Sequence, residues 1–122
     1  MLSECFEQVT SVERIYSLYE KALKNCAEYV SKRKLKLHFY DGKSGFNNGV
    51  PYDAIFFSAS LEKFPDELIK QVKGGGVVLA PTGINLQHLL AGIKELSSSK
   101  SFSISSYDVV SYVPLREGLD RR

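Results

Sequence analysis

Residues 9–40 read VTSVERIYSLYEKALKNCAEYVSKRKLKLHFY, and this stretch gives the first indication of the fold class. β-Branched residues crowd Val9–Arg14, which predicts a short strand. Apolar residues then recur in steps of three and four, which predicts a helix over 15–30 with one apolar face. Lys34–Tyr40 alternates apolar and polar residues, as a half-buried strand does. The stretch is therefore predicted to be a strand–helix–strand unit, a building block of parallel sheets.

The middle of the chain repeats this pattern. Tyr52–Ala59 has an apolar centre without alternation, which is typical of a strand covered on both faces. Leu61–Val72 has a helical pattern, and Pro65 places the start of that helix near itself. Val77–Ala80 is a further buried strand. Gly74–Gly76, between helix and strand, are predicted to stop the helix and turn the chain, because phosphate-binding loops instead follow a strand and open a helix.

The last third of the chain allows two interpretations. Apolar residues from Leu86 to Leu96 recur with helical spacing, although the segment from Leu86 to Leu90 also suits a strand. Ser97–Lys100 is predicted to turn, and the stretch from Phe102 to Val113 reads as strand. The order of elements before this region predicts an α/β fold with a mostly parallel sheet and a single domain over 1–122.

Composition and charge exclude several classes of protein. The chain has 122 residues, 43% hydrophobic and 25% charged, which is ordinary for a globular domain and not for a disordered one. The formal net charge of +2 is too small to indicate nucleic-acid binding. No apolar run reaches the ~20 residues of a membrane-spanning helix. Two cysteines make no disulfide framework, so we expect a cytoplasmic protein. His38 and His88 are far apart in the sequence and have no cysteine or carboxylate near them at the spacing of a metal site.

Two acidic residues lie where predicted strands end. Glu13 closes the first strand, and Asp41 follows the next one directly before Gly42. Ligands of open α/β sheets bind beyond the carboxyl ends of the strands. A carboxylate there can accept hydrogen bonds from both ribose hydroxyls, and a carboxylate followed by glycine can approach an adenine edge. In the alternative interpretation, Glu13 acts as a cap or pairs with Arg14 or Lys32, and Asp41 only begins a turn.

Several short segments occur in the order and at the intervals of one known family: Val12–Ile15 (VERI), Tyr40–Gly42 (YDG), Pro51–Ile55 (PYDAI), Gly75–Gly76 and Val113–Leu115 (VPL). From about Leu2 to Gly118, the sequence resembles protein-L-isoaspartate O-methyltransferases. That family uses S-adenosylmethionine to methylate the α-carboxyl group of isoaspartyl residues in damaged proteins. The ester then collapses to a succinimide, which hydrolyses partly to normal aspartate.

The resemblance implies a fold and a site. The fold would be a partial Rossmann-like S-adenosylmethionine-dependent methyltransferase fold, mostly parallel with an antiparallel C-terminal strand. It makes 86–96 a strand and about 102–113 its antiparallel neighbour. Glu13 would hold the ribose hydroxyls of S-adenosylmethionine, and Asp41 and Gly42 would flank the adenine. Ser58 and Ala59 would lie near the cofactor cleft, and isoaspartyl-containing proteins or peptides would be the partners.

The sequence also departs from the family pattern. Tyr40 stands where the family has another glycine, which would crowd the adenine side. The family's glycine-rich cofactor loop and its catalytic serine segment are expected upstream of Leu2. We therefore assign no catalytic residue within 1–122 and expect this chain alone to be inactive.

Two other functions follow from different classes of protein. The first is a non-catalytic interaction module, homo-oligomeric or domain-swapped, because the resemblance places an absent central strand between the strands at 9–14 and 52–59. Open strand edges recruit other chains. The second is a nicotinamide-dependent Rossmann enzyme, which is disfavoured because no Gly-x-Gly-x-x-Gly occurs in the sequence.

Overall fold

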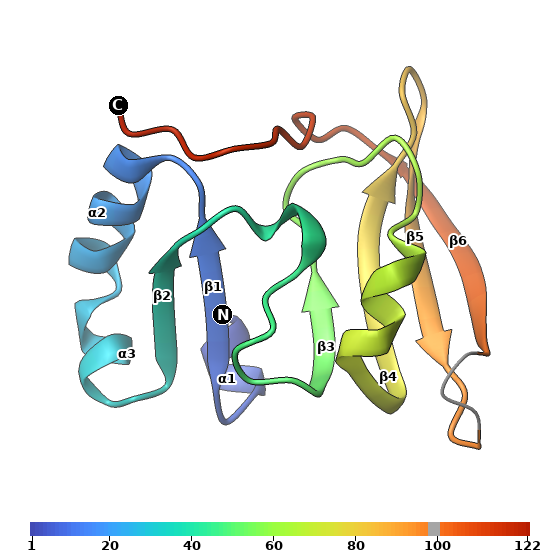
Figure 1. Cartoon of the computed structure of the whole chain (residues 1–122), viewed down its shortest axis with the longest axis horizontal. Helices are drawn as coiled ribbons and strands as arrows, with labels where there is room; N and C mark the ends of the chain where they lie inside the picture. The colour runs from blue at the N-terminus through green and yellow to red at the C-terminus, as the bar shows by residue number, and fades with distance from the viewer. Residues whose placement is uncertain (98–100) are drawn as a thin grey trace. The chain divides into compact units, whose positions relative to one another are not determined.

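The computed structural model describes residues 1–97 and 101–122, so most of the turn predicted at 97–100 lies outside the described residues. The chain folds as two compact units (Figure 1). The first comprises Met1–Lys43 together with Glu117–Arg122, and the second comprises Ser44–Arg116. In the described part of the chain, no helix is long and apolar enough to cross a membrane.

The first unit is built around a parallel pair of strands. Its elements are α1 (Leu2–Cys5), β1 (Val9–Glu13), α2 (Tyr16–Asn25), α3 (Ala27–Ser31) and β2 (Leu35–Phe39). β1 and β2 pair in parallel, with Val9 opposite Leu35 and Glu13 opposite Phe39. The predicted strand–helix–strand unit is confirmed. The predicted helix is divided at Cys26, where two weak helix formers, Asn25 and Cys26, stand together.

The second unit is a four-stranded sheet with one short helix. Its elements are β3 (Tyr52–Phe56), the 3₁₀ helix η2 (Asp66–Gln71), β4 (Val72–Thr82), β5 (Gln87–Lys94) and β6 (Phe102–Val110). A further 3₁₀ turn, η1 (Gly42–Ser44), includes residues 43 and 44, between which the sequence divides into the two units. The strand order is β3-β4-β5-β6, parallel between β3 and β4 and antiparallel from β4 to β6. The predicted α/β class with an antiparallel C-terminal strand is confirmed.

Two local predictions are wrong in this unit. The helix expected from about Pro65 is a single short 3₁₀ segment. The glycines at 74–76 do not turn the chain but lie inside β4, which begins at Val72. Between the pairs Tyr52–Val72 and Ala54–Val77, β4 contains extra residues, and Gly75 has a φ of +80° there. The glycines therefore form an irregularity within a longer strand, where a left-handed φ favours glycine.

The core of the second unit lies between the sheet and η2. Leu68, Ile69, Val72 and Val78 are almost fully buried, and partly buried aromatic and aliphatic residues pack against them: Tyr52, Ile55, Phe57, Phe64 and Phe102. Gly92 on β5 faces this core, since a Cβ there would lie 2.5 Å from Cζ of Phe64. The core fixes β3 and the residues that follow its carboxyl end.

Candidate functional site

Glu13 and Asp41 lie at the same edge of the parallel pair. Glu13 is the last residue of β1, and its register partner Phe39 is the last residue of β2. The backbone N–H of Tyr40 donates to the carbonyl of Glu13 at 3.0 Å, so the chain passes beside Glu13 just before it reaches Asp41. Both acidic residues therefore follow strand carboxyl ends in one unit, as the sequence predicts for a ligand-binding edge.

The Glu13 carboxylate shapes the turn into α2. Its Oε1 accepts a hydrogen bond from the backbone N–H of Ile15 at 2.7 Å. The predicted alternative pairs are not those that the structure shows: Lys32 bonds Glu28 at 2.8 Å, and the Arg14 side chain donates to the carbonyl of Gly118 at 2.7 Å. Glu13 is half-buried, and a carboxylate can accept further hydrogen bonds beyond one.

The Asp41 carboxylate is held from two sides. Its Oδ1 accepts the N–H of Lys43 at 3.0 Å, so Asp41 does begin a turn, and its Oδ2 accepts the N–H of Gly118 at 2.7 Å. A carboxylate offers about four acceptor positions, so two remain after these bonds. Gly42 packs tightly, because a Cβ there would lie 2.6 Å from Cγ2 of Val12.

The C-terminal segment Glu117–Arg122, to which the sequence assigns no role, adjoins both acidic residues. Asp120 pairs with Ile15 as a parallel bridge: its N–H donates to the carbonyl of Arg14 at 2.8 Å, and its carbonyl accepts from the N–H of Tyr16 at 2.7 Å. Nζ of Lys43 lies 2.7 Å from Oε2 of Glu117. No local sequence pattern predicts these contacts, because they join residues that are far apart in the sequence: Lys43 and Glu117 are 74 positions apart, and Asp120 is more than a hundred positions from Arg14 and Tyr16.

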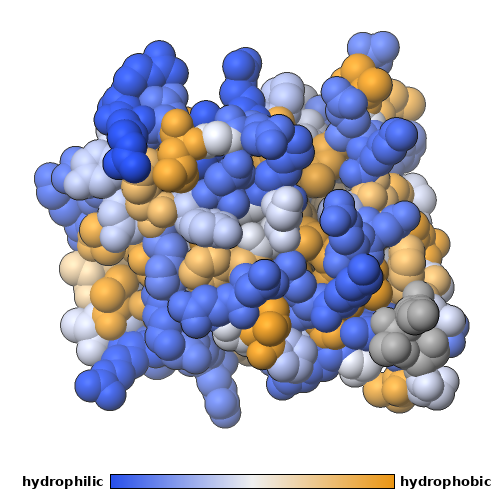
Figure 2. Space-filling model, in the orientation of Figure 1, coloured by the Kyte–Doolittle hydropathy of each residue, from blue (hydrophilic) through white to orange (hydrophobic). Residues whose placement is uncertain are grey.

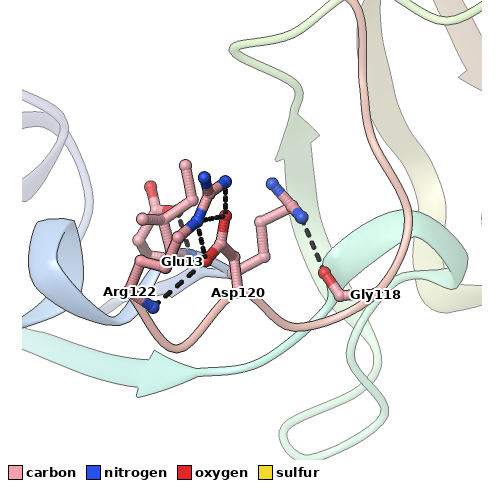
Figure 3. Close-up of polar contacts among 6 residues, drawn as sticks. Glu13, Gly118, Asp120 and Arg122 are labelled. Carbon is pink, nitrogen blue, oxygen red and sulfur yellow. Dashed lines mark hydrogen bonds and ion pairs between the residues drawn. The ribbon is translucent and has the colours of Figure 1, made fainter.

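Within this segment, Arg122 faces Asp120 (Figure 3). Nη2 of Arg122 lies 2.6 Å from Oδ2 of Asp120, whose side chain is only 13% exposed. The hydrogen bonds from the Arg122 guanidinium lower the pKa of the Asp120 carboxyl, and the nearby positive charges lower it further. The same bonds raise the pKa of Arg122. Asp120 and Arg122 therefore form an ion pair with charge-assisted hydrogen bonds beside the start of α2.

Ser58 and Ala59 belong to the second unit. They follow the carboxyl end of β3, as expected, and Ser58 is exposed whereas Ala59 is half-buried. The next residue, Ser60, is anchored: its N–H donates to the carbonyl of Val113 at 2.8 Å, and its Oγ accepts from the amide of Gln87 at 3.1 Å. The described contacts do not join Ser58 or Ala59 to Glu13 or Asp41. Among the described residues, no group of three or more His, Cys, Asp or Glu side chains could hold a metal ion.

Two solved structures of similar fold are protein-L-isoaspartate O-methyltransferases by description. A candidate protein-L-isoaspartate O-methyltransferase from Plasmodium falciparum, in complex with S-adenosyl-L-homocysteine, is similar with a TM-score of 0.74 at 20% identity, over 89% of this chain and 52% of that one. Another protein-L-isoaspartate O-methyltransferase is similar with a TM-score of 0.78 at 22% identity, over 93% of this chain and 35% of that one. The α/β fold is thus shared with protein carboxyl methyltransferases.

Sequence comparison is more specific. The family model for Protein-L-isoaspartate(D-aspartate) O-methyltransferase (PCMT) matches residues 1–120, and the chain belongs to that family. The enzyme of Burkholderia cenocepacia (strain HI2424) is 33% identical over 98% of this chain and 38% of its own length. That of Vibrio atlanticus (strain LGP32) is 36% identical over 97% of this chain and 55% of its own length. The chain therefore spans about half, or less, of the relatives that it matches.

Proposed function

We propose that residues 1–122 form the nucleoside-binding part of a protein-L-isoaspartate O-methyltransferase that acts on isoaspartyl-containing proteins. The observation that supports this most is the placement of Glu13 and Asp41 at one strand edge in a chain of this family. The family model spans both units, which supports the further proposal that 1–122 is one methyltransferase domain. Both cysteines are free, in keeping with a cytoplasmic protein.

The side chains present fit the nucleoside end of S-adenosylmethionine. Glu13 has acceptor capacity left for ribose hydroxyls, and Asp41 has two acceptor positions left for an adenine amino group. Gly42 leaves the backbone beside Asp41 without a side chain. Ser58 and Ala59, beyond the carboxyl end of β3, are proposed to lie near the cofactor. The bound cofactor would supply an activated methyl group on its sulfonium.

We further propose that these 122 residues do not transfer the methyl group by themselves. Methyl transfer needs the sulfonium and the acceptor carboxylate held in line, and such positioning supplies up to ~7–11 kcal/mol of the barrier reduction. Glu13, Asp41 and Gly42 would grip only the nucleoside, far from the methyl group. Binding without orientation of the reacting atoms does not lower the barrier.

Calorimetric titration with S-adenosylhomocysteine tests the nucleoside assignment. We expect weak, saturable binding that is lost in Glu13→Gln and in Asp41→Asn. Glu28→Gln is the matched control, because Glu28 is an exposed acid in the same unit whose carboxylate pairs with Lys32. Absence of saturation at millimolar ligand, or equal binding by all variants, would refute the assignment.

Tritiated methyl transfer to a short isoaspartyl peptide tests the second proposal. The Vibrio atlanticus relative serves as positive control, and we expect no measurable turnover by the 122-residue chain. Turnover within tenfold of the control would mean that other residues complete the site, and the proposed inactivity would be wrong.

The second candidate function is a non-catalytic interaction or oligomerisation module. In the described sheets β1 pairs only with β2, and β3 pairs only with β4, so both are edge strands. Large hydrophobic side chains are also exposed, and Figure 2 shows hydrophobic patches between hydrophilic residues on the face drawn. Open parallel edges favour association with another chain or another copy, and so do exposed apolar side chains elsewhere on the surface.

A further inference from the structure

We propose that the C-terminal segment Glu117–Arg122 is a positioning element for the adenine end of the site. Through the backbone N–H of Gly118, it holds the Asp41 carboxylate in the orientation that contacts adenine. This inference rests on the proposed function, because it takes Asp41 to be the adenine contact. It assigns no direct ligand contact to Gly118.

Two backbone donors fix the Asp41 carboxylate. The N–H of Lys43, in the turn that Asp41 begins, reaches Oδ1 at 3.0 Å, and the N–H of Gly118 reaches Oδ2 at 2.7 Å. A turn bond alone leaves the other oxygen free to move as the side chain rotates. A second donor on the other oxygen defines the plane of the carboxylate and the direction of its remaining acceptor positions.

Gly118 is itself held at both of its polar backbone groups. Its N–H binds Asp41, and its carbonyl accepts from Nε of Arg14 at 2.7 Å, a contact drawn in Figure 3. Its φ is +83°, and no atom lies within 4 Å of where a Cβ would stand. Glycine is therefore favoured here by the backbone conformation and not by a lack of space.

The segment is anchored on both sides of Gly118. Before it, Glu117 pairs with Lys43, the residue whose N–H also binds Asp41. After it, Asp120 bonds the backbone at Arg14 and Tyr16, and the Arg121 guanidinium lies 5.3 Å from the centre of the Phe39 ring at the end of β2. These contacts place the donor of Gly118 at the strand edge that carries Asp41.

A matched pair of substitutions separates backbone position from side-chain size. Gly118→Val disfavours the left-handed φ strongly, whereas Gly118→Asn adds a side chain of similar size that tolerates it. The first measurement needs no ligand. NMR measures the hydrogen-exchange protection of the backbone amides at positions 118 and 43, and the coupling constants that report the χ1 angle of Asp41. The second is the ratio of affinities for S-adenosylhomocysteine and S-inosylhomocysteine, since inosine presents an acceptor where adenine presents its amino group.

We expect Gly118→Val to lower the protection of both amides by about tenfold or more, to average the Asp41 χ1 coupling and to remove the preference for the adenosyl ligand. Gly118→Asn should keep all three. An unchanged Asp41 rotamer in Gly118→Val would overturn the inference whether or not any ligand binds. So would a lost rotamer with an unchanged ligand preference.

Should Gly118→Val unfold the first unit, as judged by the amide of Leu37 in β2, Arg14→Ala and Arg14→Lys replace it. Arg14→Ala removes the donor to the Gly118 carbonyl, and Arg14→Lys restores one. The same result is expected from the alanine variant, with rescue by lysine. If the unsubstituted chain binds neither ligand while the Asp41 rotamer changes as expected, the nucleoside assignment fails and the positioning of Asp41 by Gly118 is upheld.

Discussion

At the scale of single residues, the presence of glycine at position 42 has two explanations. The ligand explanation is that glycine lets an adenine edge approach Asp41. The packing explanation is that Val12, in the neighbouring strand, leaves no room for a Cβ, since that atom would lie 2.6 Å from its Cγ2. The two are compatible, but only the second acts without a ligand, so stability and binding must be measured separately.

Gly42→Ala is expected to lower the free energy of unfolding by about 1–2 kcal/mol, because Val is stiff at χ1 and cannot swing away freely. Urea denaturation measures the loss. In the Val12→Ala background the added methyl group fits, so the same substitution should cost much less. Equal costs in the two backgrounds would show that Val12 is not the obstacle.

Asp120 predicts a pH dependence of the C-terminal segment. Arg122 lowers the pKa of the Asp120 carboxyl in the folded chain. The Asp120–Arg122 pair therefore stabilises the C-terminal segment fully above the ordinary carboxyl pKa of about 3.9, and this stabilisation is lost as the pH falls towards the lowered pKa. We expect the amide protection factor of Tyr16, which donates to the Asp120 carbonyl, to be constant from about pH 7 to 5 and to fall below about 4. Asp120→Asn should remove that step, and a step that persists in this variant would assign it to another group.

At the scale of elements, η2 contributes more to stability than its length suggests. It is one short 3₁₀ segment, yet Leu68 and Ile69 are 1% and 2% exposed against the sheet. Short 3₁₀ helices have poor hydrogen-bond geometry and are seldom stable alone. The apolar contacts of η2 with the sheet therefore hold it in place.

Leu68→Ala is expected to destabilise the chain by about 2–5 kcal/mol, through lost burial and the cavity left behind. Lys70→Ala, an exposed position of the same helix, should change stability by less than about 0.5 kcal/mol. Thermal or urea unfolding compares the two. Similar losses for both variants would mean that helix propensity, and not burial, stabilises η2.

At the scale of the whole molecule, the open strand edges are the feature with the clearest consequence. β1 and β3 each have one strand partner among the described residues, and both belong to parallel pairs. Parallel sheets are usually covered and extended by further strands, because unpaired backbone groups at an apolar edge are unfavourable.

We therefore expect the isolated chain to self-associate in a concentration-dependent way. Sedimentation equilibrium between about 5 and 200 µM should give an average mass above 13.7 kDa that rises with concentration. A monodisperse species of 13.7 kDa over this range would contradict the prediction and remove the main support for the interaction-module function.

Local sequence patterns were sufficient for much of the fold. β-Branched runs and alternation placed β1, β2 and β3 to within a few residues, since those signals depend only on neighbours in the chain. For β5 the pattern was ambiguous, because Ala91 and Gly92 are buried on opposite faces and no alternation remains to be read. Family resemblance, not periodicity, resolved that segment as a strand.

The acidic residues at the strand edge were also predictable, because strand ends and parallel pairing follow from the order of elements. Their hydrogen-bond partners were not. Gly118, Arg14 and Asp120 meet Asp41 and the start of α2 through contacts that span most of the chain. The glycines at 74–76 lie within a strand because β3 pairs with β4 on both sides of them, at Val72 and from Val77 onward. Local propensity carries information over a few residues, whereas such long-range contacts exist only once folding has brought the two ends of the chain together.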